Sequence, residues 1–80
     1  MKTTNITEEN EKQLKTMREN FKALRENKGW GFKELSKISK ISVNTLADIE
    51  QGEDFDVIYL IRLCRIYNIE PHKIFSPVVL

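Results

Sequence analysis

The sequence has few of the residues that form covalent or metal cross-links. It contains one cysteine, Cys64, and one histidine, His72. A lone cysteine excludes an internal disulfide and fits a reducing compartment. The histidine has no second histidine or cysteine at ligand spacing, so we expect no metal site. We expect Cys64 to be a small buried apolar side chain.

Glycine, proline and long apolar runs are also scarce. Only three glycines and two prolines interrupt the 80 residues. The most apolar stretch, residues 57–63, contains Arg62 and is too short to cross a bilayer. The first residues lack the apolar core of a signal peptide. The length of 80 residues predicts one domain over residues 1–80. The absence of a membrane span and of a signal peptide predicts a location in the cytoplasm with no membrane partner.

Recognisable catalytic groups are missing as well. No Ser, His and Asp set offers a role for each member, and no glycine-rich loop is present to hold a phosphate. We therefore predict that the protein is not an enzyme and that it takes no cofactor and no small-molecule substrate.

Charge is unevenly distributed, although the net charge is only +1. Residues 1–28 carry seven Lys or Arg against five Glu, and residues 57–80 carry three Lys or Arg against one Glu. Residues 32–56, in contrast, carry three Lys against six Asp or Glu. The middle of the chain is therefore locally acidic, which bears on any polyanionic partner.

The spacing of apolar residues predicts five helices. The first runs from an N-cap at Thr7 to residues 27–28, and Gly29 can adopt the left-handed conformation after it. Its apolar side chains fall on one face: Leu14, Met17, Phe21 and Leu24. We expect Trp30, which follows, to pack in the core.

Four shorter helices follow, over residues 32–38, 43–51, 57–67 and 71–75. A tight turn over residues 39–41 separates the first two, and Ser42 and Asp56 are expected N-caps. Gly52 ends the helix over 43–51, and Asn68 can close the next helix in the left-handed conformation. Pro71 opens the fifth helix, which ends before residue 76. The inward side chains of the two central helices are Leu35, Leu46 and Ile49.

Two short helices joined by a tight turn, here over residues 32–51, form a helix-turn-helix. The residues that match a known pattern are Phe21, Leu24-Arg25, Lys28-Gly29, Leu35, Ile41-Ser42, Thr45-Leu46, Ile49-Glu50, Gly52, Leu60, Leu63-Cys64, Tyr67-Asn68-Ile69 and Ile74-Phe75. At this spacing, over about residues 17–75, the chain resembles the lambda-repressor and Cro-like, or XRE, family. The resemblance implies an all-α, five-helix lambda-repressor-like DNA-binding domain, here with an extended first helix and an apolar C-terminal tail.

The resemblance implies a sequence-specific transcriptional regulator that binds double-stranded DNA, a repressor of the phage or mobile-element kind. By helical geometry Val43, Asn44 and Asp48 point outward from the helix over 43–51, and matching positions in the family read base edges in the major groove. The side chains expected near phosphates are Lys33, Lys37, Lys40, Ser42 and Thr45.

The resemblance also implies a structural ion pair between Arg25 and Glu50, which match positions that are paired in some family members. It would tie the helix over 43–51 to the first helix. The alternative is that the two are unrelated solvated charges.

Three features depart from the family pattern. The family usually has a glutamine, clamped to phosphate, where this chain has Phe32. The loop after the third helix is shorter and acidic, Glu53-Asp54-Phe55-Asp56, and Asp48 places a carboxylate on the reading face. Because carboxylates repel phosphate, we expect weaker or more selective DNA binding than is usual. The alternative function is a protein-interaction module on the same scaffold, such as an anti-repressor or an antitoxin-like partner of another regulator.

The helix over residues 57–67 is apolar almost all round. One face, with Val57, Leu60, Leu63, Cys64 and Tyr67, is enough for the core. The surplus needs a cover, which the first helix's extension, the C-terminal tail or a second subunit can supply. We predict a homodimer, and the alternative is intramolecular packing. The expected dimer or partner surface comprises Ile58, Tyr59, Ile61, Ile66, Phe75, Val78, Val79 and Leu80.

Overall fold

The computed structural model describes the backbone of residues 4–77 and the side chains of residues 10–77. Four α-helices follow one another: α1 (Thr4–Asn27), α2 (Phe32–Ser39), α3 (Val43–Gln51) and α4 (Val57–Ile66). A 3₁₀ helix, η1 (Pro71–Phe75), ends the described chain. The predicted all-α class is confirmed, but the fifth helix is not α-helical, since its five residues form tight turns instead.

The helix ends follow local sequence signals, with one clear correction. Helix α1 begins at Thr4, so the predicted cap at Thr7 is wrong. Residues 4–6 include no glycine or proline, and nothing in the backbone stops the helix from starting earlier. Ser42 accepts a hydrogen bond from the amide of Thr45, and Asp56 accepts one from Ile58, as N-caps do.

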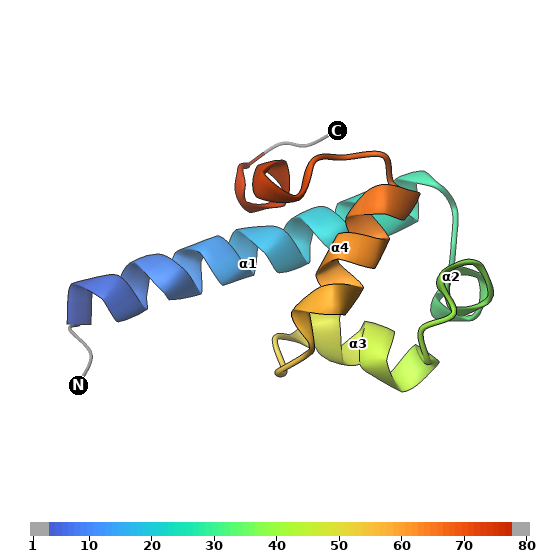
Figure 1. Ribbon diagram of the computed structural model, residues 1–80, viewed down its shortest axis with the longest axis horizontal. Coiled ribbons are helices and arrows are strands. Elements are labelled where there is room, and N and C mark those ends of the chain that lie inside the picture. The colour runs from blue at the N-terminus through green and yellow to red at the C-terminus, as the bar shows by residue number, and fades with distance from the viewer. Residues whose placement is uncertain (1–3, 78–80) are drawn as a thin grey trace.

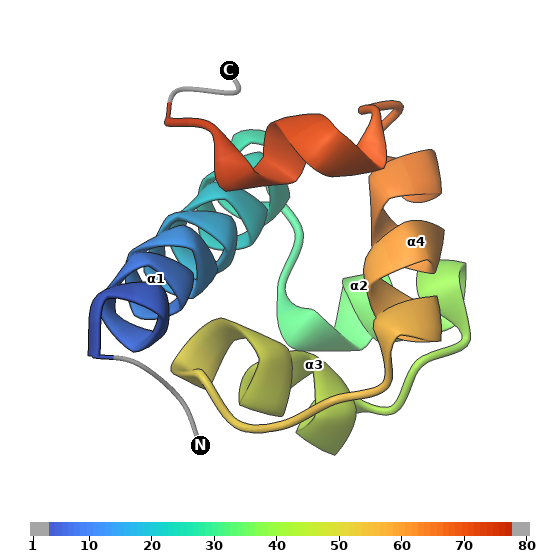
Figure 2. The ribbon, with the colours of Figure 1, turned by 60° about the vertical axis from the view of Figure 1, so that its left-hand side comes forward.

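The helices surround one core (Figures 1 and 2). In Figure 2, α1, η1, α4 and α3 lie around the edge of the molecule, and α2 lies beside α3 and α4. Every described element contributes a side chain to the centre. The buried apolar residues are Met17, Phe21, Leu24, Leu35, Ile41, Leu46, Ile49, Leu60, Leu63, Cys64, Tyr67 and Ile74. Cys64 is thus part of the core, and burial raises the pKa of its thiol.

Two apolar residues expected in the core are largely exposed. Val57 is 63% exposed, because it is the first residue of α4 and points past the end of the core. Leu14 is 42% exposed, because the N-terminal half of α1 extends beyond the other helices (Figure 1). The extension of α1 therefore does not bury Leu14, and Leu14 lines an apolar groove of about 310 Å³ together with Phe55, Val57 and Phe75.

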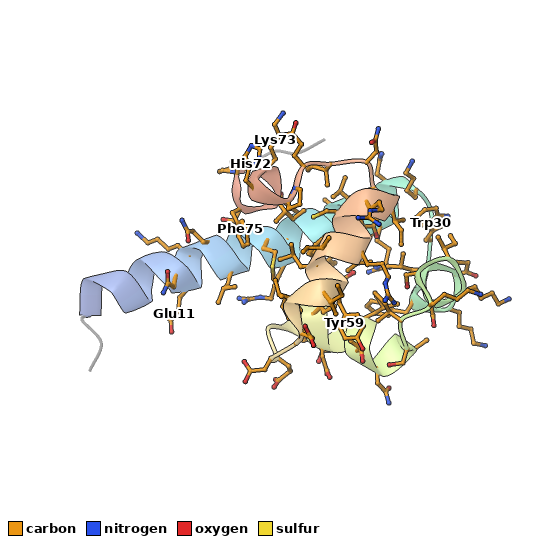
Figure 3. The ribbon with its side chains drawn as sticks, in the orientation of Figure 1. Glu11, Trp30, Tyr59, His72, Lys73 and Phe75 are labelled. Carbon is orange, nitrogen blue, oxygen red and sulfur yellow. The ribbon has the colours of Figure 1, made fainter. Side chains whose placement is uncertain are left out.

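A buried amide fixes η1 to α1. The Asn20 side chain is 7% exposed and donates hydrogen bonds to the carbonyl oxygens of Ile74 and Ser76, both at 2.7 Å. Phe75 lies between η1 and α1, while His72 and Lys73 point away from α1 (Figure 3). Val78, Val79 and Leu80, which belong to the predicted dimer surface, lie outside the described residues.

Aromatic side chains close the end of the core where α1 turns into α2. The ring of Trp30 stacks on that of Tyr67 with centroids 6.0 Å apart, and Phe21 lies 6.3 Å from Tyr67. Trp30 is partly buried against the core, as predicted. Among the described residues, the buried Tyr67 hydroxyl has no hydrogen-bond partner.

Tyr67 therefore supplies a prediction about alkaline pH. Burial, and then the nearby Glu50 carboxylate, raises the pKa of Tyr67 to about 12. In the unfolded chain the phenol loses its proton near pH 10, so the folded state holds one more proton between pH 10 and 12. The free energy of unfolding falls over that window, by roughly 2–3 kcal/mol from this group.

The Tyr67→Phe variant removes this titration and the unpaired hydroxyl together. At pH 7 its stability should equal or exceed that of the wild type by up to about 1 kcal/mol. The difference in the free energy of unfolding between the variant and the wild type should grow between pH 10 and 12, because only the wild type loses stability through Tyr67. Other alkaline titrations, including that of Cys64, affect both proteins equally. Urea unfolding at several pH values measures the difference, and a constant difference across pH would contradict the explanation.

Candidate nucleic-acid interface

The turn between α2 and α3 is fixed by two serines. The Ser36 hydroxyl donates to the carbonyl of Ile41 at 2.6 Å, and the amide of Ile41 donates to the Ser39 hydroxyl at 3.1 Å. Between them Lys40 adopts a left-handed conformation with φ 63°. The side chain of Ile41 then inserts into the core, and this sets where α3 begins.

Two hydroxyls at the start of α3 are already hydrogen bonded to each other. Ser42 accepts from the amide of Thr45 at 3.1 Å and donates to the hydroxyl of Thr45 at 2.9 Å. The proton on the Thr45 hydroxyl remains for another acceptor. This arrangement stabilises the first turn of α3 and leaves Ser42 little capacity for an additional ligand.

The outward side of α3 carries the residues that the sequence predicted. Val43 is 39% exposed and Asn44 is exposed, while Leu46 and Ile49 on the opposite side are buried. Asp48 is half-buried, one turn further along. Three lysines that precede α3 in the chain, on α2 and in the turn, are exposed: Lys33, Lys37 and Lys40.

Arg25 connects α1, α3 and the α1–α2 loop. Its Nε and Nη2 atoms donate to the two carboxylate oxygens of Glu50 at 2.8 and 3.0 Å. Its Nη1 atom donates to the carbonyl of Trp30 at 2.9 Å. The two side chains are 12% and 9% exposed, so water screens the pair only weakly. The hydrogen bond to Glu50 raises the pKa of Arg25.

Phe32 covers this ion pair. The Arg25 guanidinium carbon lies 4.3 Å from the centroid of the Phe32 ring, within the range of cation–π attraction. Phe32 is half-buried, so at the position of the family's phosphate-clamping glutamine this chain has a side chain that packs against the protein. Phe32 could be recognised from the sequence as a departure from the family pattern, but its contact with Arg25 could not be predicted.

Glu34 is a residue that the sequence analysis did not single out. Its carboxylate accepts a hydrogen bond from the amide of Gly31 at 2.9 Å, at the N-terminus of α2. A carboxylate there interacts favourably with the positive end of the helix. The pattern Gly31-Phe32-Lys33-Glu34, with Glu at the third helical position, was the signal that could have indicated it.

The C-terminal end of α3 differs in charge from its start. Glu53, Asp54 and Asp56 follow Gly52 and are all exposed. Arg18 of α1 packs against Gly52, where an added Cβ would lie 3.1 Å from the guanidinium carbon and where φ is +93°. Along the chain, exposed lysines therefore precede α3 and exposed carboxylates follow it.

The family model for the XRE-type, lambda-repressor-like helix-turn-helix matches residues 21–74. The protein belongs to this family. Its members are DNA-binding transcription regulators, and the match runs from the last seven residues of α1 through α2, α3 and α4 to Ile74 in η1. No curated protein and no solved structure matches the chain. No helix within residues 4–77 is long and apolar enough to span a membrane.

The ion pair between Arg25 and Glu50 stabilises the packing of α3 against α1. In the Glu50→Gln variant Arg25 keeps its place but loses its counter-charge, so we expect the free energy of unfolding to fall by about 2–3 kcal/mol. Chemical denaturation measures the loss. The double variant Arg25→Met, Glu50→Leu should recover most of it, because a neutral apolar pair needs no counter-charge. A Glu50→Gln variant as stable as the wild type would contradict this assignment.

The left-handed backbone conformation of Lys40 predicts a variant that is more stable than the wild type. Only glycine adopts φ 63° without a Cβ penalty, so Lys40→Gly should stabilise the protein by about 1 kcal/mol. The matched control is Lys37→Gly, inside α2, which should destabilise it by about 1 kcal/mol. Thermal unfolding of the two variants compares them directly, and a loss of stability in both would contradict the strain at Lys40.

Proposed function

We propose that this protein recognises specific DNA sequences by inserting α3 into the major groove, and that it represses transcription by occluding a promoter. The observation that carries the proposal is the division of α3 into two sides. Leu46 and Ile49 fix one side in the core, while Val43 and Asn44 stand exposed at its N-terminal end. Recognition helices contact base edges with these N-terminal residues.

The exposed groups match the chemistry of base edges. The Asn44 amide can donate to N7 and accept from N6 of one adenine, and the Val43 methyl groups suit the methyl group of thymine. Asp48, being half-buried, would accept only from a cytosine amino group that approaches closely. We therefore propose Asn44 as the main source of sequence preference.

The phosphate contacts should be few. Lys33, Lys37 and Lys40 supply the positive charge near the start of α3, and the carboxylates that follow Gly52 repel DNA at the other end. Three phosphate contacts give a slope of about −3 in a plot of log affinity against log salt concentration, for each subunit. Binding should thus be weak without a matching sequence.

A two-fold arrangement would compensate for the small contact of each subunit. One α3 reads only a few base pairs, and two copies on a palindromic site double both the base contacts and the phosphate contacts. We propose a homodimer on DNA for this reason. The carboxylates beyond α3 favour the second candidate function, in which this end of the face binds a basic protein partner.

Asn44→Ala tests the leading function. The probe is a library of random DNA duplexes, from which the wild type should enrich one sequence at low salt. The variant should bind that sequence about 10- to 100-fold more weakly, which corresponds to the 1–3 kcal/mol of a lost bidentate contact. Fluorescence anisotropy with the enriched duplex measures the change.

Asn10→Ala is the matched control, since Asn10 is an exposed amide on the projecting part of α1. It should bind the enriched duplex like the wild type. If the wild type enriches no sequence, or if Asn44→Ala binds the enriched duplex as well as Asn10→Ala does, the proposed DNA-reading role of α3 is wrong. Either result would favour the protein-interaction function.

A further inference from the structure

The apolar groove of about 310 Å³ lies between the projecting half of α1 and the loop that joins α3 to α4. The buried side chains of Met17 and Leu60 contribute to its base, while Leu14 and Val57 at its edges are 42% and 63% exposed. Phe55 of the loop adds a half-buried ring. No element of the described chain covers this groove, although its lining is mostly apolar.

The groove differs from the partner surface that the sequence predicted. Of that surface, Ile58 and Ile61 are exposed on α4, whereas Tyr59 and Ile66 are half-buried and pack against the core. Phe75 is half-buried and lines the groove. The groove takes its lining from α1, the α3–α4 loop, α4 and η1 together. Such a concave surface surrounds an inserted apolar side chain on several sides, which removes more apolar area from water than one helix face does.

Carboxylates flank the groove on α1 and on the α3–α4 loop. Glu53 and Asp54 line it from the loop, and both are exposed. Glu11 is exposed seven residues before Arg18, on the same face of α1, and Figure 3 shows it on the side of α1 where the α3–α4 loop lies. Arg18 is the one basic residue among the described residues that line the groove. It is half-buried against Gly52 at the C-terminal end of α3, where the helix dipole attracts a positive charge.

We propose that this groove binds an amphipathic helix of a partner protein, which has a narrow apolar stripe with Lys or Arg on both sides of it. The part of α1 from Glu11 to Arg18 is about 10 Å long at 1.5 Å per residue, which is the length from residue i to residue i+7 of a second helix. The partner's apolar side chains at i, i+3 or i+4, and i+7 would therefore enter the groove. The carboxylates on its two sides would then face the partner's cations, and so they select a basic helix.

The groove is separate from the residues proposed to read DNA. Asn44 lies in the first turn of α3, whereas the groove begins at Gly52, eight residues later and about 12 Å further along the helix axis. Glu53 and Asp54 also repel phosphate, so the groove does not extend the DNA surface. The inference therefore gives a defined chemistry to the second candidate function, and it does not depend on the DNA-reading role of α3.

A displayed library of random peptides tests the chemistry of the partner. Peptides of about 18 residues can form about five helical turns. Those that the wild type enriches should share apolar residues at i, i+3 or i+4, and i+7, with Lys or Arg on both sides. Fluorescence anisotropy with one enriched peptide then gives the dissociation constant.

Two pairs of variants locate the binding surface. Leu14→Asp should weaken binding of the enriched peptide by about tenfold or more, while Ile61→Asp, at a similarly exposed apolar residue outside the groove, should leave it unchanged. Asp54→Lys should weaken binding about three- to tenfold at low salt, and less as salt is added. Its control is Glu19→Lys, at an exposed carboxylate of α1 that does not line the groove. A peptide with its flanking Lys changed to Glu should bind Asp54→Lys better than the wild type.

Four results would overturn the proposal: no enriched peptide, an enriched motif flanked by Asp or Glu, equal binding to Leu14→Asp and Ile61→Asp, or self-association of the wild type that Leu14→Asp abolishes. The last result would make a second copy the occupant of the groove. Circular dichroism should show that all variants are folded. Asn44→Ala should bind the peptide like the wild type. Peptide enrichment without DNA enrichment would overturn only the DNA-reading role of α3.

Discussion

The contact between Arg25 and Glu50 joins parts of the chain that the apolar core alone does not orient. Leu46 and Ile49 hold one side of α3 in the core, but apolar packing by itself is non-directional. A bidentate guanidinium–carboxylate contact has a fixed planar geometry. It therefore ties the C-terminal part of α3 to α1, while Val43 and Asn44 at the start of α3 stay exposed.

The same guanidinium also orders the approach to α2. It holds the carbonyl of Trp30, and its flat side lies against Phe32. A glutamine at position 32 would leave this side of the ion pair open to water, which would weaken it. Phe32 thus shields the ion pair at the start of α2, and its ring has no hydrogen-bonding group of its own.

Most helix ends could be predicted from local signals, although the cap at Thr7 is wrong, and features that depend on a neighbouring element could not be predicted. The caps at Ser42 and Asp56 follow from residue type and position alone. The exposure of Val57 depends on which element lies beyond the end of α4, and the sequence does not state this. The cover that Phe32 gives to Arg25 depends likewise on the path of the α1–α2 loop. In α3, residue type indicated which side faces outward. The hydrogen bond between the hydroxyls of Ser42 and Thr45 could not be predicted, because it depends on the rotamers of both side chains.

The homodimer and the few phosphate contacts proposed above have a joint consequence for regulation. If each subunit holds DNA through about three lysines, one subunit alone does not bind tightly, and two must act together. Occupancy of a palindrome then depends on the square of the free protein concentration, since two monomers must arrive together. Such a protein discriminates sharply between low and high concentrations of itself. On this proposal the carboxylates that follow α3 strengthen that discrimination, because they repel phosphate and so disfavour binding to unrelated DNA.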